Sequence, residues 1–443
     1  MAERKRNSSA LPSSLALLAA SVLLATACAP GGGAGGDGTT AEGGELDGVE
    51  LLVAAKWTGV EQRNFEQVLD AFEEKTGATV TYDSTGEDTG AYLGPRIEGG
   101  DPPDVAVLPQ PGLVAEYVDQ GALYPLQGEA AQALEDNYGD YWQRLGGVAG
   151  DSYGIMIKAA HKSIVWYRPE AFEQAGVTAP TDWDEMVTTT AATLSDAGSA
   201  PFAMCGASGW TLTDWFENVY LSQAGPDAYD QLIAHEIPWT DDSVVTALQT
   251  LNEIWDAPEL MLDGTDGAVN TGFPDCVSRV FGQQEAAMVY EGDFASANIV
   301  ESGAEVGASA QAFPFPAVGD EPPVVVGGDI AVAMSEQEGT QQLLAYLASP
   351  EAGTTWAELG GYLSANSNVP AEAYADEFTR QLAQTILDAG DNVRYDLSDQ
   401  VPSAFGATAG SGMWAILQDH LRDPGDPEAT AEKLEQAATE AGQ

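Results

Sequence analysis

The chain of 443 residues carries 69 acidic side chains against 16 lysines and arginines, a formal net charge of −53. A protein this acidic repels phosphate backbones and anionic membranes, which excludes nucleic acid as a partner. The hydrophobic fraction of 44% is ordinary for a globular chain. The length exceeds what a single hydrophobic core usually serves, so we predict two domains or lobes.

The N-terminus has the features of an export signal. A basic stretch, Arg4–Arg6, precedes the mostly apolar segment Leu11–Ala25. That segment is too short and too interrupted by Pro12 and serines to span a membrane, which takes about 20 apolar residues. We therefore interpret residues 1–27 as a secretory signal peptide.

The end of the signal, Leu24–Cys28, resembles a bacterial lipobox, in which the cysteine receives a lipid and becomes the mature N-terminus. Ala25 departs mildly from the usual Leu, Val or Ile, and an ordinary signal with an incidental cysteine is the alternative. Lipidated Cys28 would anchor the protein to the outer face of the cell membrane through the lipid alone. The Gly-rich stretch 28–47 has no hydrophobic pattern and predicts a flexible tether.

Two further cysteines, Cys205 and Cys276, remain after Cys28. An exported chain meets an oxidising environment, so we expect these two to form a disulfide. Two buried free thiols are the alternative.

Short apolar runs alternate with helical patterns along the chain. Thr58 and Glu61 have the spacing of a capping box before a helix that ends near Gly77, and Thr240 is expected to cap a later helix. Strands are predicted at Val49–Ala55, Thr79–Tyr82, Asp104–Leu108, Gly154–Ile157, Ile164–Tyr167 and Ala286–Tyr290. Val324–Met334 is predicted as a strand pair or as one long strand interrupted by Gly327–Gly328. This alternation predicts α/β lobes with mainly parallel sheets flanked by helices.

Several pieces of the sequence resemble the extracellular solute-binding proteins of carbohydrate ABC importers, the family that includes maltose-binding protein. The resemblance is strongest to its alpha-glucoside-binding branch. The pieces are Lys56–Gly59 with Glu61, Gly99–Val105, Pro109–Gly112, Lys162 with Val165–Tyr167, Pro180–Trp183, Cys205, Gly209–Trp210 with Thr213–Trp215, Met288–Phe294, Gly327–Asp329, Asp396–Asp399 and Met413–Trp414.

The resemblance implies a two-lobed periplasmic-binding-protein-like fold whose chain crosses between lobes three times. We place the crossings near Ala159–Ala160, near Gln311 and near Pro350. The N-terminal lobe is then expected over 48–159 plus 312–350, and the C-terminal lobe over 161–310 plus 352–440.

A sugar offers apolar C–H faces to aromatic rings and hydroxyls to carboxylates, amides and ammonium groups. Side chains of these kinds at the family's positions are the predicted ligand-binding residues: Trp57, Glu61, Gln110, Lys162, Trp210, Asp214, Trp215, Glu291, Asp293, Phe294, Asp329 and Trp414. The alternatives are core packing for Trp57, helix capping for Glu61 and Asp214, and a solvated lysine for Lys162. The family often has Trp where Phe294 stands, which implies a smaller stacking surface.

The sequence contains neither an H-E-x-x-H nor a G-x-S-x-G motif, and no metal-ligand spacing. We therefore assign no catalytic residue, no metal and no cofactor. The predicted function is capture of a carbohydrate, an alpha-glucoside or short oligosaccharide, by a monomer that delivers it to ABC permease subunits. The alternatives are another small solute, a sensor as the recipient, and a secreted glycoside-acting enzyme with a carboxylate pair.

Overall fold

The structure is a computed structural model that describes residues 44–86 and 89–443. The predicted signal peptide, Cys28 and most of the predicted tether lie outside the described residues. Leu46, near the end of that tether, is buried, and its backbone N–H donates to the carbonyl of Thr76 at 2.9 Å. The packed part of the chain therefore begins slightly before the first predicted strand.

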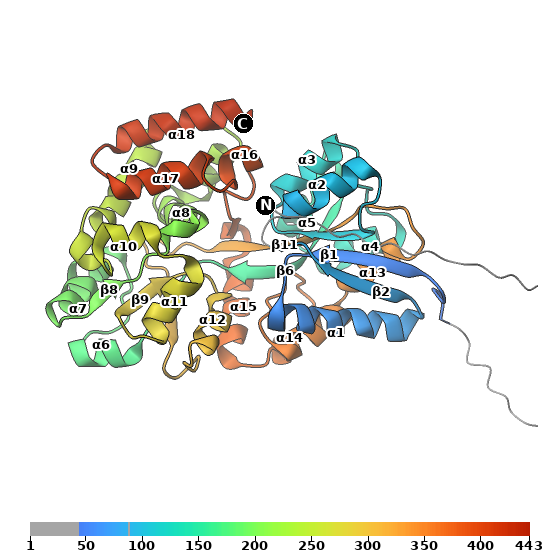
Figure 1. The fold of residues 1–443 in the computed structure, drawn as a ribbon, viewed down its shortest axis with the longest axis horizontal. Helices are drawn as coiled ribbons and strands as arrows, with labels where there is room; N and C mark the ends of the chain where they lie inside the picture. The colour runs from blue at the N-terminus through green and yellow to red at the C-terminus, as the bar shows by residue number, and fades with distance from the viewer. Residues whose placement is uncertain (1–43, 87–88) are drawn as a thin grey trace, which may run out of the picture. The chain divides into compact units, whose positions relative to one another are not determined.

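One sheet, here called the first sheet, has six strands in the order β12-β11-β3-β1-β2, with β6 also paired to β11. Its strands are β1 (Glu50–Ala55), β2 (Thr79–Ser84), β3 (Val105–Leu108), β6 (Gly154–His161), β11 (Val325–Ala333) and β12 (Arg394–Tyr395). β1 runs parallel to β2 and β3, whereas β11 runs antiparallel to β3 and β6. Figure 1 shows β6 and β11 reaching from this sheet toward the other half of the chain.

A second sheet has four strands in the order β10-β7-β9-β8. They are β7 (Ile164–Tyr167), β8 (Ala200–Phe202), β9 (Ala286–Tyr290) and β10 (Gln311–Pro314), and a separate hairpin joins β4 (Gly147–Val148) to β5 (Asp151–Ser152). β7 pairs antiparallel with both β9 and β10, and only β8 and β9 are parallel. The predicted α/β class is confirmed, but the sheets are mixed, because strands that return from the other sheet enter in the opposite direction.

The strands show where the chain passes between the two sheets. It leaves the first sheet after His161 and enters the second at Ile164. It returns between Pro314 and Val325, a little later than the predicted crossing near Gln311. Near Pro350 the chain stays with the first sheet, because α14 packs on α1, and β12 still pairs with β11. Residues 43–443 form one compact unit, so the residue bounds of the two lobes stay a prediction.

Helices accompany both sheets. The segments around the first sheet contain α1 (Gly59–Thr76), α2 (Thr89–Gly99), α3 (Gly112–Asp119), α4 (Gly128–Asn137), α5 (Asp140–Leu145), α13 (Thr340–Leu347), α14 (Pro350–Leu359) and α15 (Glu377–Ala389). Those around the second contain α6 (Pro169–Ala175), α7 (Ala192–Asp196), α8 (Trp210–Ile233), α9 (Asp242–Trp255), α10 (Gly264–Asn270), α11 (Phe273–Phe281), α12 (Ala295–Glu301), α16 (Ser403–Gly406), α17 (Gly412–Arg422) and α18 (Pro427–Ala441). A seven-residue π-helix, Glu185–Ala191, leads directly into α7. Short 3-10 helices lie at Gly206–Ser208, Pro258–Leu260, Ala371–Ala373 and Gly390–Asn392.

Two helix starts differ from the sequence prediction. Thr58 is the N-cap of α1, but its side chain makes no capping bond. Glu61 instead pairs with the ammonium group of Lys158, a charged partner that outcompetes a neutral backbone N–H. The cap of α9 is Asp241 rather than Thr240, since the Asp241 carboxylate accepts from the Ser243 N–H at 2.9 Å.

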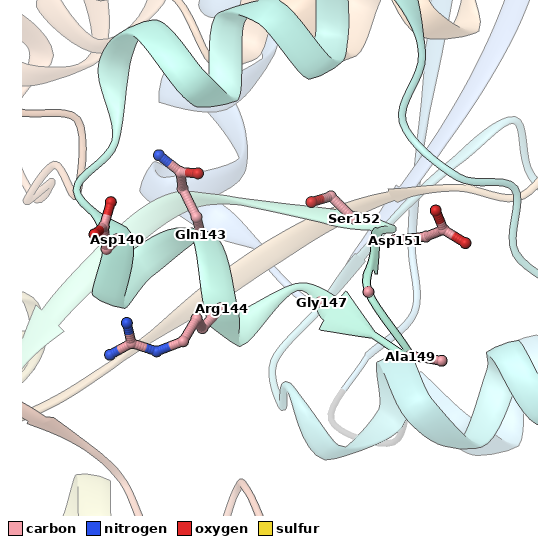
Figure 2. Close-up of a pocket in the computed structure, with 8 residues that line it drawn as sticks. Asp140, Gln143, Arg144, Gly147, Ala149, Asp151 and Ser152 are labelled. Carbon is pink, nitrogen blue, oxygen red and sulfur yellow. The ribbon is translucent and has the colours of Figure 1, made fainter.

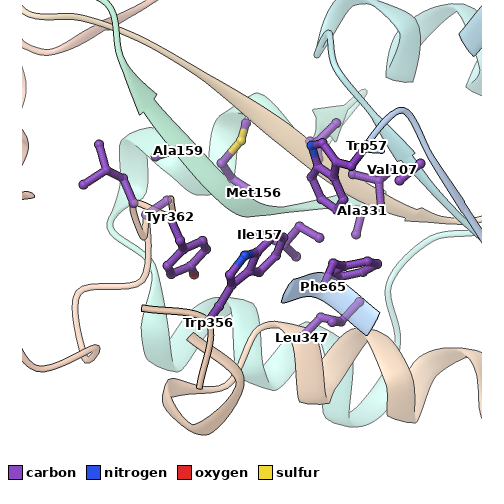
Figure 3. Close-up of a cluster of buried hydrophobic side chains, with 14 of the residues drawn as sticks. Trp57, Phe65, Val107, Met156, Ile157, Ala159, Ala331, Leu347, Trp356 and Tyr362 are labelled. Carbon is purple, nitrogen blue, oxygen red and sulfur yellow. The ribbon is translucent and has the colours of Figure 1, made fainter. Parts of the chain in front are cut away.

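The core under the first sheet contains a group of aromatic rings (Figure 3). Trp57 packs edge-on against Phe65 and Trp356, with ring centroids 4.8 and 5.1 Å apart, and Trp356 stacks on Tyr362 at 4.7 Å. The ring of Trp57 is only 2% exposed. This packing fixes the loop that follows β1, which carries charged residues described next.

Candidate functional site

Charged side chains gather at the end of β1 and along β6 and β11 of the first sheet. Lys56 follows β1, and its ammonium nitrogen lies 3.1 Å from a carboxylate oxygen of Asp329 on β11. Lys158 on β6 pairs with Glu61 and lies 5.6 Å from the ring centre of Trp57. Burial alone would lower the pKa of Lys158, but Glu61 and then Asp329 outweigh it and raise that pKa. The ammonium group of Lys158 is therefore charged beside Glu61 at neutral pH.

Lys162, just after β6, connects the two halves of the site. Its nitrogen lies 3.1 Å from Asp214 Oδ1 on α8 and also pairs with Asp396, which follows β12. The lysine side chain is 12% exposed and each carboxylate 1%. Burial would lower the pKa of Lys162, but Asp214 and Asp396 raise it well above its usual range. A buried ammonium thus holds segments that are far apart in sequence.

The loop after β12 completes a network of acidic groups. Glu217 accepts hydrogen bonds from the backbone N–H groups of Leu397 and Ser398, both at 3.0 Å. Asp399, next in the loop, forms a hydrogen bond with Gln110, which follows β3. Burial and then the charge of Asp396 raise the pKa of Asp399 to about 7. Gln110 thereby joins the first sheet to this loop.

Carboxylate oxygens of Asp214, Glu217 and Asp396 lie within 4.8 Å of one another, a spacing that a cation would accept. Lys162 already supplies a positive charge to two of these groups, and backbone N–H groups occupy both oxygens of Glu217. We therefore interpret this cluster as an ion-pair network that shapes the site.

Glu291 and Asp293 follow β9 on the second sheet. Glu291 is 1% exposed, and neither of its carboxylate oxygens has a hydrogen-bond partner among the described residues. Burial and then the neighbouring Asp214 raise its pKa well above the usual range. Asp293 accepts from the backbone N–H of His161 at 2.6 Å, and burial raises its pKa to about 6. Glu291 therefore presents acceptor oxygens that lack a donor.

An aromatic wall lies beside these charges. It consists of four half-buried side chains, Trp210, Phe273, Phe294 and Trp414. The ring centre of Trp210 lies 5.4 Å from that of Phe273 and 5.9 Å from that of Phe294, and Lys162 Nζ lies 5.7 Å from the Trp210 ring. Gly209, with φ of +76°, leaves no room for a Cβ, which would lie 2.8 Å from the Cβ of Trp414. The wall thus packs closely and borders the ion pairs.

Most of the predicted ligand-binding residues meet in this region. Ion pairs, hydrogen bonds or ring contacts connect Glu61, Gln110, Lys162, Trp210, Asp214, Asp293, Phe294 and Asp329 with their neighbours as described above. Trp57 and Trp215 lie in the core, where Trp215 packs edge-on against Tyr290 at 4.7 Å and against three other rings. Ligand contact by each of the twelve residues stays a prediction.

Sequence reasoning missed Phe273, Lys56 and Lys158. Phe273 stands three residues before Cys276, and the predicted disulfide could have placed it near Trp210. The disulfide itself is confirmed: Cys205 and Cys276 are bonded, with Cα atoms 5.6 Å apart. Lys158 gave no signal, because its partner Glu61 is 97 residues away in the chain.

A hollow of about 570 Å³ lies elsewhere on the surface, around α5 and the β4–β5 hairpin (Figure 2). Its lining is polar and glycine-rich and contains none of the predicted ligand-binding residues: Asp140, Gln143, Arg144, Gly147, Ala149, Gly150, Asp151 and Ser152. It has no aromatic ring to stack on a sugar. We therefore place the candidate site at the charged cluster and the aromatic wall.

Known proteins resemble this chain over most of its length. The chain is 34% identical over 392 residues to the osmoprotective compounds-binding protein GgtB of Synechocystis, covering 85% of this chain and 90% of the relative. It is 31% identical over 397 residues to the alpha-glucosides-binding periplasmic protein AglE of Rhizobium meliloti, covering 86% and 85%.

Solved structures share the fold. The bacterial solute receptor AcbH, described as preferring b-D-galactopyranose, gives a TM-score of 0.75 at 18% identity, covering 89% of this chain and 99% of that one. RafE in complex with raffinose gives 0.71 at 18% identity, covering 89% and 100%. This likeness confirms the predicted two-lobed periplasmic-binding-protein-like fold.

Within residues 44–86 and 89–443, no helix combines the length and the apolar character that crossing a membrane requires. Residues 57–354 match the family described as bacterial extracellular solute-binding protein, which confirms the resemblance seen in the sequence motifs. Together with the two relatives, this match shows that the chain belongs to the bacterial extracellular solute-binding proteins.

Proposed function

We propose that this protein captures a carbohydrate, an alpha-glucoside or short oligosaccharide, and delivers it to the permease subunits of an ABC importer. The observation that carries the proposal is Glu291, a buried carboxyl group without a hydrogen-bond donor among the described residues, close to Asp214 and three residues before Phe294 of the aromatic wall. Sugar hydroxyls supply the donors that Glu291 lacks, and a pyranose C–H face suits the rings. The name of the Rhizobium meliloti relative supports alpha-glucosides as the class.

The charges of the site also favour an uncharged ligand. Asp214, Glu217, Asp396 and Asp399 surround the single ammonium group of Lys162. An anionic sugar, such as a sugar phosphate, would enter a region with an excess of carboxylates and meet repulsion there. A neutral polyol gains hydrogen bonds from the same groups without that cost.

Calorimetric titration against a panel of sugars tests the proposal. The panel contains maltose, sucrose and trehalose as alpha-glucosides, cellobiose as the beta-linked control, raffinose, and glucose 6-phosphate as an anionic control. We expect binding of at least one alpha-glucoside and none of the phosphate ester. Binding of cellobiose with no alpha-glucoside would contradict the proposed anomeric preference, and no binding of any sugar would contradict the carbohydrate function.

A second ligand class, an osmoprotective solute, has support in the name of the Synechocystis relative. Trehalose and sucrose in the panel represent osmoprotective sugars. Glycine betaine represents an osmoprotective solute that is not a sugar. Tight binding of betaine alone would favour this second function. Incubation with nitrophenyl glycosides tests the alternative of a glycoside-acting enzyme, for which we expect no release of nitrophenol.

The anchor and the partner complete the proposal. Lipidated Cys28 would hold the monomer at the outer face of the cell membrane, and Cys28→Ser is expected to release it into the medium. In proteoliposomes with the ABC importer, the loaded protein should stimulate ATP hydrolysis more than the empty one, because the permease would recognise the ligand-closed state. Stimulation of a sensor kinase but not of the importer would favour the sensory alternative.

A further inference from the structure

We propose that the Cys205–Cys276 disulfide positions the aromatic wall of the ligand site, and that Phe273 is a stacking residue of that wall. The inference rests on the proposed function, since it takes a carbohydrate as the ligand. It assigns a binding role to Phe273 and a positioning role to a bridge that would otherwise count only toward stability.

The bridge joins the two segments that carry Trp210 and Phe273, two of the four rings of the wall. Cys205 lies five residues before Trp210, and Cys276 lies on α11, one helical turn after Phe273. The backbone N–H of Phe273 donates to Ser208 Oγ at 3.2 Å, within the same turn that leads into Trp210. The ring centres of Trp210 and Phe273 are then 5.4 Å apart. The disulfide therefore sits at the base of this ring pair.

The same turn fixes the start of α8. Thr211 Oγ1 donates to the carbonyl of Cys205 at 2.8 Å, and the two residues are both buried. Trp210 and Asp214 are four residues apart in α8 and so lie on one face of the helix. Holding the first turn of α8 thus places a stacking ring and the carboxylate that pairs with Lys162 at the same time.

Phe273 enlarges the stacking surface of the wall, which would be smaller if Phe294 were its only phenyl ring. The two phenyl rings meet edge-on with centroids 5.5 Å apart, and both contact Trp210. All three residues are half-buried, and the Lys162 ammonium nitrogen lies 5.7 Å from the ring centre of Trp210. Aromatic surface beside hydrogen-bonding groups is the pairing that a pyranose requires. Phe273 therefore supplies stacking area that a Trp at position 294 would otherwise provide.

The experiment measures the dissociation constant of the tightest sugar of the panel by calorimetry. The variants are Phe273→Ala, Phe273→Tyr and the double variant Cys205→Ser/Cys276→Ser, with Phe273→Ala also made in the bridge-free background. Phe378→Ala is the matched control, because Phe378 is another half-buried ring that packs on a tryptophan, Trp166 at 4.9 Å, and among the described residues it makes no ring contact with the wall.

We expect Phe273→Ala to weaken binding about fivefold to tenfold, and Phe273→Tyr to restore it, because the ring is what stacks. The bridge-free protein should bind about tenfold more weakly. In that background Phe273→Ala should add less than twofold, since the ring is no longer held in place. If the bridge only stabilised the fold, Phe273→Ala would weaken binding by the same factor with and without the disulfide. Phe378→Ala should leave sugar affinity unchanged.

If the bridge-free protein does not fold, Gly209→Ala takes its place, because it disturbs the turn between the bridge and the wall while keeping the disulfide. It should weaken binding about tenfold. Wild-type affinity in folded Phe273→Ala, or in both the bridge-free and Gly209→Ala proteins, would overturn the inference and leave the carbohydrate function standing. Failure of the wild type to bind any sugar would overturn the carbohydrate function instead.

Discussion

The ammonium nitrogen of Lys162 lies 3.1 Å from Asp214 Oδ1 and also contacts Asp396, so one buried cation joins α8 to the loop after β12. Each carboxylate is 1% exposed, which means that neither has water as a substitute partner. The three groups form a buried ion-pair network rather than a surface salt bridge. Removing the Lys162 ammonium group therefore tests how much this ion-pair network contributes to the stability of the fold.

Replacing Lys162 with Met should lower the free energy of unfolding by about 3–5 kcal/mol, because two carboxylates stay buried without their counter-charge. Urea denaturation of the ligand-free protein measures it. Lys75→Met is the matched control, since the Lys75–Glu351 pair is more than half exposed and should contribute less than about 1 kcal/mol. Equal effects of the two substitutions would contradict the interpretation that Lys162 stabilises the fold through buried ion pairs.

Replacing Glu291 with Gln should separate stability from binding. The empty protein should keep its stability or gain about 1 kcal/mol, because a buried carboxylate without donors is removed. Sugar affinity should fall by about 1–3 kcal/mol, because the amide nitrogen of Gln cannot accept the hydrogen bond that a carboxyl oxygen of Glu291 accepts from a sugar hydroxyl. Denaturation and calorimetry measure the two effects, with Glu305→Gln on the exposed surface as the control. A large loss of stability would show that Glu291 has a protein partner instead.

Asp293 and Asp399 should each lower the stability of the empty protein as the pH rises from about 4 to 7. Burial raises the pKa of Asp293 to about 6 and that of Asp399 to about 7, both above their values in the unfolded chain. At these two carboxyl groups the folded state binds more protons than the unfolded state in this window, so their deprotonation favours unfolding. The pKa values of His161 and His420, which burial lowers to about 4, act in the opposite direction below about pH 6.5. Thermal unfolding between pH 4 and 8 measures the slope.

Asp399→Asn should flatten the upper part of this pH profile, near pH 7, and leave the part below pH 6 to Asp293. The exposed substitution Asp388→Asn is the control and should keep the wild-type slope. An Asp399→Asn protein that keeps the wild-type pH dependence between pH 5 and 7 would contradict the raised pKa of Asp399.

Trp57 should act on stability before it acts on binding. Trp57→Ala is expected to cost about 3–5 kcal/mol, because the ring fills the core between Phe65 and Trp356. Trp57→Phe should retain most of the stability and leave sugar affinity within about threefold. Val60→Ala, at a side chain that is 58% exposed, is the control and should change stability by less than about 0.5 kcal/mol. A stable Trp57→Phe protein with lost affinity would favour direct ligand contact.

Local sequence patterns determined much of the secondary structure. The run Ala286–Tyr290 is β9 with the predicted bounds, and β1, β3, β7 and β11 fall within a residue or two of their predictions. Each is a short apolar run bounded by turn residues, a signal that needs no distant partner. The disulfide between Cys205 and Cys276 was likewise predicted from the expected redox environment alone. The predicted helix caps were wrong. Glu61 pairs with Lys158 instead of capping α1, and Asp241 rather than Thr240 caps α9.

Only the tertiary structure decided which side chains form the site. Lys162 meets Asp214 and Asp396 across 52 and 234 residues of chain, and no local pattern encodes such pairings. In α8 every residue from Thr211 to Leu221 is buried, so hydrophobic periodicity could not tell Trp210 at the wall from Trp215 in the core. The sequence by itself determined the elements and the family, because these depend on residue types at close spacing. The site depended on how two sheets bring distant strand ends together, which packing alone sets.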